Sequence, residues 1–134
     1  MNIKNGICGL ILTTSLITGG CESNRHPEYN GFNGKIGEAV VEFKTREGFW
    51  IDENTLTAKF SDGTTITYID YPKNNQPDEL KIDRVIITKN DITTKYSVHS
   101  SNPSIQEKIK IAQNNFDEYL KKIIEIQTSA LYKK

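Results

Sequence analysis

The chain has 134 residues, of which 36% are hydrophobic and 25% are charged, values close to those of average globular domains. Its 17 basic and 17 acidic residues balance, so no net charge would draw the protein to nucleic acid, and we expect no nucleic-acid partner. The length fits one domain, and two cysteines are too few for a disulfide framework.

The first 20 residues have the composition of a signal peptide. Lys4 is their only charge, and an apolar run from Gly6 to Gly20 follows it. This run is shorter than the about 20 strongly apolar residues of a membrane-spanning helix, and threonine and glycine dilute it. We therefore predict that residues 1–20 are a signal peptide that is removed from the mature protein.

The residues that lead into Cys21 carry a more specific signal. Leu16-Ile17-Thr18-Gly19-Gly20-Cys21 resembles the lipobox of bacterial prolipoproteins, with Thr18 in the place where that family usually has leucine. The resemblance covers the first 21 residues only. It implies that diacylglyceryl is attached to the Cys21 thiol and that the chain is then cleaved before Cys21.

The same resemblance implies a membrane as partner. Acyl chains on Cys21, at about 0.8 kcal/mol for each buried methylene, would anchor the protein firmly. In enteric-type lipoproteins an aspartate after the cysteine signals retention in the inner membrane, and this chain has Glu22 there. The resemblance therefore favours the outer membrane, with the domain facing the periplasm or the cell surface. The polar residues 21–35 are predicted to form a flexible tether that includes a solvent-exposed His26.

Residues 36–99 have the short β-rich segments and turn residues of an antiparallel meander of about five strands. Residues 38–44 are the expected first strand, and a turn at residues 46–48 leads to a short second strand at residues 49–51. Together with a helix that follows, the strands define one α+β domain over residues 36–134.

Asp62-Gly63 predicts a β-hairpin with a two-residue type I′ turn, because both residues accept a positive φ. That register places Leu56 opposite Ile69 and turns Ile66 and Tyr68 to the other face of the sheet.

A second hairpin is predicted to join residues 80–88 with residues 92–99. Its expected turn is the three-residue loop Lys89-Asn90-Asp91. A two-residue loop is the alternative, and it would move every side chain of the second strand to the opposite face.

Residues 104–132 are predicted to form a long amphipathic helix. Ser104 and Glu107 have the spacing of a capping box that begins such a helix. Apolar residues then recur at steps of four and three, which predicts one stripe that packs on the sheet: Ile105, Ile109, Ala112, Phe116, Tyr119, Ile123, Ile126 and Ala130. The alternative is that the stripe pairs with another helix in a coiled coil.

The mature chain offers little material for catalysis. His99 is the only imidazole outside the expected tether, no phosphate-binding glycine motif occurs, and no His, Asp or Glu cluster has metal-ligand spacing. The sequence therefore predicts no enzyme, no catalytic residue, no metal site and no cofactor. Trp50, Ile66 and Tyr68 are expected on the sheet face that the helix leaves uncovered, where they are candidates for binding a partner.

The expected function is that of a small envelope lipoprotein with a noncatalytic protein-binding domain, of the inhibitor, immunity or exclusion type. A structural role is the alternative, in which the helix pairs with a partner and links the membrane to another envelope layer. A small hydrolase is the third hypothesis, and it requires a cleft around a group such as His99.

Replacing Cys21 with alanine should abolish lipidation, because the thiol is the acceptor. We expect intact-mass analysis of the wild type to show cleavage before Cys21 plus acyl chains, and Cys21→Ala to lose both the added mass and membrane association. Cys8→Ala is the matched control, since Cys8 lies in the predicted signal peptide and should change neither property. A soluble, unacylated wild-type product would contradict the prediction.

Overall fold

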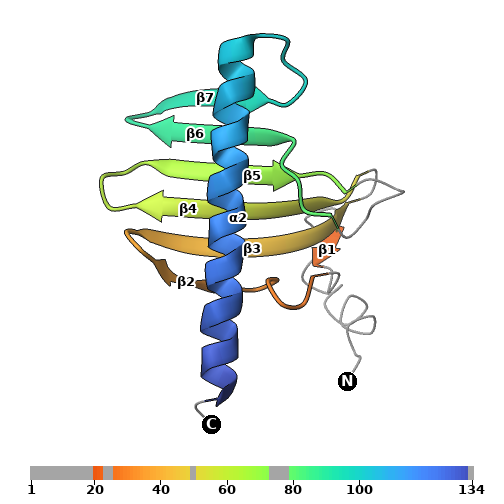
Figure 1. The fold of residues 1–134 in the computed structure, drawn as a ribbon, viewed down its shortest axis with the longest axis vertical. Helices are drawn as coiled ribbons and strands as arrows, with labels where there is room; N and C mark the ends of the chain where they lie inside the picture. Colours follow the sequence, from red (N-terminus) through yellow and green to blue (C-terminus); the bar gives the residue numbers. More distant parts are fainter. Residues whose placement is uncertain (1–19, 23–25, 49–50, 73–78, 133–134) are drawn as a thin grey trace.

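A single antiparallel sheet carries one long helix across one of its faces (Figure 1). The computed structural model describes residues 20–22, 26–48, 51–72 and 79–132. The elements are β1 (Gly20–Glu22), β2 (Asn33–Ile36), β3 (Ala39–Gly48), β4 (Glu53–Phe60), β5 (Thr65–Asp70), β6 (Arg84–Lys89), β7 (Ile92–Ser97) and α2 (Pro103–Tyr132). The predicted α+β class is confirmed.

The strands follow each other as a meander from β3 to β7. The outer edge of β3 has two partners: β2 pairs with one end of this strand, and the short β1 pairs with the other. These two strands account for the difference from the predicted number of about five.

The predicted turn at residues 46–48 is wrong, because β3 continues through Gly48. Arg46 pairs with Glu53 of β4, and Glu47 pairs with Cys21 of β1, so both neighbours hold this stretch in the sheet. Residues 49–50 of the predicted second strand lie outside the described residues, and Ile51 is not part of a strand.

The prediction of a flexible tether over residues 21–35 is also wrong for its described part, because Cys21 and Glu22 lie in β1 and residues 26–35 are ordered. His26 and Phe32 are buried, and the backbone N–H groups of Tyr29 and Asn30 donate hydrogen bonds to the His26 carbonyl at 3.0 and 2.8 Å. Asn33 then begins β2. The folded domain therefore begins at least ten residues earlier than composition indicated, because the aromatic side chains among these polar residues belong to the core.

The first hairpin has a three-residue loop, not the predicted two-residue turn. The Gly63 amide donates to the Phe60 carbonyl at 3.1 Å, and Gly63 adopts a φ of 93°. This combination is a type I turn followed by a bulge at a left-handed residue. Leu56 consequently pairs with Tyr68, and Ile66 and Tyr68 lie on the same face as Leu56.

The second hairpin also differs from the prediction, but here the loop is one residue shorter than predicted. Lys89 pairs with Ile92, so the loop is Asn90-Asp91, with φ values of 53° and 66° as a type I′ turn requires. Val85 therefore pairs with Tyr96. The predicted register would have placed Arg84 opposite Tyr96 and mixed a charged side chain into the apolar face.

The helix α2 begins one residue before its predicted start. The Asn102 side chain accepts a hydrogen bond from the Ser104 amide at 2.8 Å, and the Asn102 carbonyl accepts from Gln106 at 3.0 Å. Asn102 is thus the N-cap, and Pro103 occupies the first helical position, where its missing N–H costs nothing. The predicted capping box of Ser104 and Glu107 is wrong, since Asn102 already satisfies the first turn.

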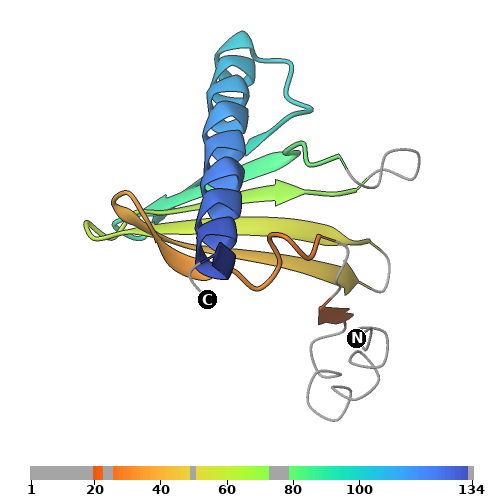
Figure 2. The same ribbon diagram turned by 60° about the horizontal axis from the view of Figure 1, so that its bottom comes forward.

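The helix runs across the strands on one face of the sheet (Figures 1 and 2), and most of the predicted apolar stripe packs into the core between helix and sheet. The last part of the stripe does not contribute, because Ile126 and Ala130 are exposed. The C-terminal end of α2 extends past β2 (Figure 1). The core of the helix–sheet interface is formed by buried residues of both layers: Ala39, Val41, Phe43, Leu56, Ala58, Tyr68, Val85, Ile109, Ala112, Phe116, Leu120 and Ile123.

Truncation of Phe116 should separate the packed part of the stripe from its exposed end. Phe116→Ala removes a fully buried ring, and we expect it to lower the free energy of unfolding by about 3–5 kcal/mol in urea titrations. Ile126→Ala is the control, because Ile126 is 41% exposed, and its effect should stay below about 1 kcal/mol. Equal effects would mean that the helix is not held by the sheet.

Candidate functional site: an apolar groove beside the helix

One flank of α2 is closed by the segment that leads into β6. The Ile82 amide donates to the Gln113 side chain at 2.9 Å, and the Gln113 amide donates to Asp117 at 2.8 Å. Ile82 is buried and Leu80 packs against the core. This segment therefore covers the apolar face on that side of the helix.

A row of buried polar residues holds this segment in place. Thr45, Asn54 and Asp70 are direct cross-strand neighbours on β3, β4 and β5 and are all buried. The Asn54 side chain donates to Asp70 at 2.8 Å, and the other oxygen of Asp70 accepts from the Lys81 amide at 3.4 Å. Because a buried carboxylate requires such partners, this row fixes the position of the covering segment.

The other flank of α2 is open and forms an apolar groove. Two adjoining hollows of about 270 and 360 Å³ share Ile66, Tyr68 and Asn115, so they are parts of one depression. We call this depression the groove. Its further lining residues are Ile36, Gly37, Glu38, Phe60, Val85, Ile87, Tyr96, Lys108, Ile111, Ala112, Glu118, Tyr119 and Lys122.

The helix contributes one wall of the groove through a second stripe, adjacent to the buried one. Lys108, Ile111, Asn115, Glu118 and Lys122 recur at steps of three and four and therefore share a side of α2. The floor is the inner face of the sheet near its hairpin turns. The groove thus combines an apolar floor with a mixed polar and charged rim, the usual composition of a binding surface.

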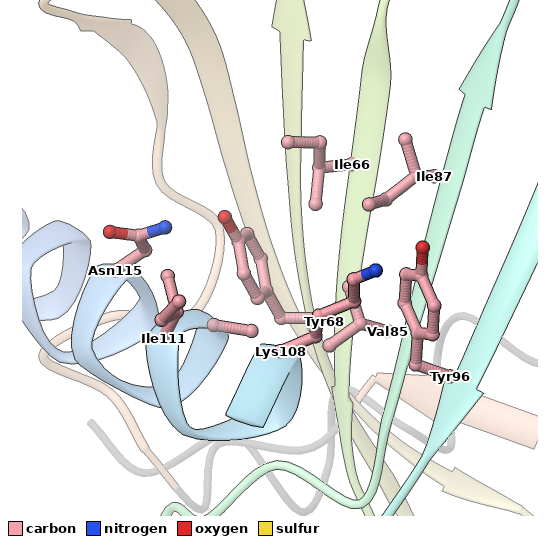
Figure 3. A pocket seen from close by; sticks show the side chains of 9 residues that line it. Ile66, Tyr68, Val85, Ile87, Tyr96, Lys108, Ile111 and Asn115 are labelled. Carbon is pink, nitrogen blue, oxygen red and sulfur yellow. The ribbon is translucent and has the colours of Figure 1, made fainter. Parts of the chain in front are cut away.

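Tyr68 lies at the centre of the floor. Its ring packs against Phe116 and Tyr119 at centroid distances of 5.8 and 6.1 Å, and the residue is only 2% exposed. Its hydroxyl points into the hollow (Figure 3) and has no hydrogen-bond partner in the described part of the chain. Burial raises the pKa of the Tyr68 hydroxyl well above its ordinary value, and proximity of Tyr119 adds to this. Tyr68 therefore offers an uncharged hydrogen-bonding group to an occupant of the groove.

Lys108 provides a positive charge at the mouth of the groove. Its ammonium lies 5.6 Å from the centroid of the Tyr96 ring, within the range of a cation–π contact (Figure 3). Lys108 forms no ion pair with any described residue. An acidic group on a binding partner would therefore meet an unpaired lysine here.

The residues predicted for partner binding have different positions from those expected. The prediction placed Ile66 and Tyr68 on the sheet face away from the helix, and this is wrong because the first hairpin has a longer loop. Both residues nevertheless line the groove. Trp50 lies outside the described residues, and Cys21 is described as a backbone position in β1, opposite Glu47.

Sequence reasoning missed most of the groove. The sequence predicted only the main stripe of the helix, and the longer loop expected in the second hairpin paired Tyr96 with Arg84 in place of Val85. A sequence signal does exist for the wall, since Ile111 is an apolar residue outside the main stripe. Ile111 is 53% exposed and lines the groove.

Comparison with protein-family models, with curated proteins and with solved structures gave no match to this chain. Within the described ranges, no helix combines the length and apolarity needed to cross a membrane. The same ranges contain no group of three His, Cys, Asp or Glu residues arranged to hold a metal ion.

The raised pKa of Tyr68 predicts a loss of stability at alkaline pH. A tyrosine whose pKa is higher in the folded than in the unfolded state stabilises the fold fully below about pH 10, and this contribution is lost as the pH rises further. We expect the free energy of unfolding of the wild type to fall above pH 10, and that of Tyr68→Phe to fall less steeply. Urea titrations at pH 8, 10 and 11 measure this difference, and identical slopes would contradict it.

Proposed function

We propose that the protein is a lipid-anchored envelope protein whose folded domain is a noncatalytic module that binds another protein through the groove. The observation that carries this proposal is the apolar surface left open on one flank of α2. A partner that covers this surface would gain binding free energy, because each buried Å² of apolar surface contributes about 25 cal/mol.

The chemistry of the groove supports a protein partner. Tyrosines 68, 96 and 119 supply large contact areas that still carry polar groups, and aliphatic side chains lie between them. Lysine, glutamate and asparagine side chains surround this apolar centre, as in protein–protein interfaces with an apolar core and a polar rim.

The position of Cys21 supports the anchoring part of the proposal. β1 pairs with residues 46–48, at one end of β3. The groove lies near the other ends of the strands, where Ala39 pairs with Phe60 and Thr65 with Thr88. Figure 1 shows β1 and these hairpin turns on opposite sides of the helix. Lipid on Cys21 would therefore leave the groove accessible to a partner.

A structural linking role is the second candidate, and the exposed end of α2 favours it. Ile124 and Ile126 are both exposed, at 39% and 41%, in the C-terminal part of α2. A partner helix that covers them would connect the anchored protein to another envelope component.

Site-specific photo-crosslinking in the envelope of the native host tests the groove. A photoreactive amino acid at position 111 should give a crosslinked adduct with a protein, because this position lies in the groove wall. Position 40 is the matched control, since Val40 is similarly exposed, at 49% against 53% for Ile111, but lies outside the groove.

We expect the adduct at position 111 only, and we expect Ile87→Glu to weaken it at least about tenfold by placing a charge in the groove. Adducts of equal yield at both positions, or none at position 111, would overturn the proposal. A third photoreactive residue, at position 126, tests the linking role, and an adduct at this position alone would favour that role.

A further inference from the structure

The strand β7 forms a free edge of the sheet directly beside the groove. It pairs with β6, and no other described strand pairs with it. Lys89 and Ile92 close the two-residue hairpin, so alternate residues from Ile92 onwards turn their backbone groups towards β6. The hydrogen bond from the Val98 amide to the Asp83 carbonyl, at 3.0 Å, follows the same alternation.

This alternation leaves Thr93 and Lys95 with outward-facing N–H and C=O groups. The next outward carbonyl, that of Ser97, accepts a hydrogen bond from the Ser100 amide at 3.1 Å. The part of the edge that is available for pairing is therefore short and is centred on Thr93 and Lys95. Unpaired backbone groups of this kind are the usual template for an added strand.

The inner face of β7 is also uncovered. Ile92 is 69% exposed, Thr94 is exposed, and Tyr96 is half-buried at the mouth of the groove. These three residues share one face of the strand because they alternate along it. A strand added to β7 would place its own inward side chains beside Ile92 and Tyr96, where the apolar surface of the groove continues.

The charge around this edge indicates what the added strand carries. Lys95 lies on the outer face of β7 and Lys108 over the inner face, and neither is paired within the described residues, whereas Lys89 lies 3.5 Å from Asp62. A directly opposite acidic side chain on the added strand would pair with Lys95.

A second copy of the chain fits this edge less well. Residues 92–97 contain one lysine and no acid, so a second copy of β7 would offer Lys95 another lysine and no acidic partner. Like charges across an interface oppose association.

We infer that the groove's partner presents an extended segment, with apolar and acidic residues on opposite faces, that adds to β7 at Thr93 and Lys95. This inference rests on the proposed function and names the chemistry of the partner. Main-chain hydrogen bonds hold the segment at the edge, its apolar side chains enter the groove, and its acidic side chains face Lys95.

The probe is a panel of nine-residue fluorescent peptides in which isoleucine, valine or phenylalanine alternates with glutamate or threonine. Binding to the full mature lipoprotein in nanodiscs is measured by anisotropy, with empty nanodiscs as the blank. Each binding peptide is also made in two N-methylated forms, which block the N–H groups of odd or of even residues. Only every second N–H of an added strand faces β7, so one form should bind at least about tenfold more weakly and the other within about twofold.

Variants of the edge test the same contact from the protein side. Thr93→Pro removes an outward N–H, which an edge strand tolerates, and should weaken peptide binding at least about tenfold. Thr93→Val is the matched control, because it keeps the N–H and removes only the hydroxyl that lies 3.1 Å from the Thr88 hydroxyl. Lys95→Glu should weaken binding, and peptides with lysine in place of glutamate should restore it. Urea titrations of all variants verify that they fold.

Strand addition would be overturned if no peptide of the panel binds, if both N-methylated forms bind as well as the parent, or if Thr93→Pro and Thr93→Val behave alike. Self-association of the protein that Thr93→Pro abolishes would also overturn it, since a second copy would then occupy the edge. The proposed function has a separate readout: an adduct at position 111 that persists in Thr93→Pro would retain the groove as a binding site while excluding the edge.

Discussion

In a single sheet with one apolar face, other segments have to cover that face, and in this protein one helix covers most of it. The longer strands have 6 to 10 residues, which corresponds to about 20–33 Å, whereas a helix with its side chains is only about 10–12 Å wide. A helix that crosses the strands therefore covers a central band and leaves an apolar strip on each side. Whether another segment covers each strip determines the surface chemistry of the domain.

The two strips differ in whether other described segments cover them. On one side, the segment before β6 closes the surface, and the hydrogen bonds of Gln113 and Asp70 hold it there. The segment that contains His26 and Phe32 also packs against the domain. On the side of the hairpin turns, the chain has no comparable segment among the described residues, and the groove remains. The groove is thus a direct consequence of asymmetric coverage of one sheet face.

The order found for β1 and for residues 26–36 has a consequence for the proposed lipid anchor. With lipid on Cys21, the anchor would lie on β1, which pairs directly with β3 of the sheet. The domain would then lie close to the membrane on the β1 side, and a partner would approach from the side of the hairpin turns. A long flexible tether would have imposed no such orientation.

The two hairpins show why sheet faces are difficult to assign from local sequence. Asp62-Gly63 is compatible with a two-residue turn and also with a longer loop that uses Gly63 in the left-handed region. The structure adopts the longer loop because it places Tyr68 opposite Leu56 in the core. In the second hairpin, Asn90 and Asp91 accept positive φ values so that Val85 and Tyr96 share the apolar face. In both cases packing over the whole face decides the register, and the turn adapts.

By itself, the sequence determined the α+β class, the meander and the long C-terminal helix with its packed stripe, because hydrophobic periodicity is a local property of each segment. It also carries the lipobox resemblance that ends at Cys21. Only the tertiary structure decided which faces Ile66, Tyr68 and Tyr96 occupy, since a slip of one residue in register inverts a strand. The groove was decided there too, because it depends on which segments cover the two sides of α2, and that coverage is set by contacts between residues distant in the chain.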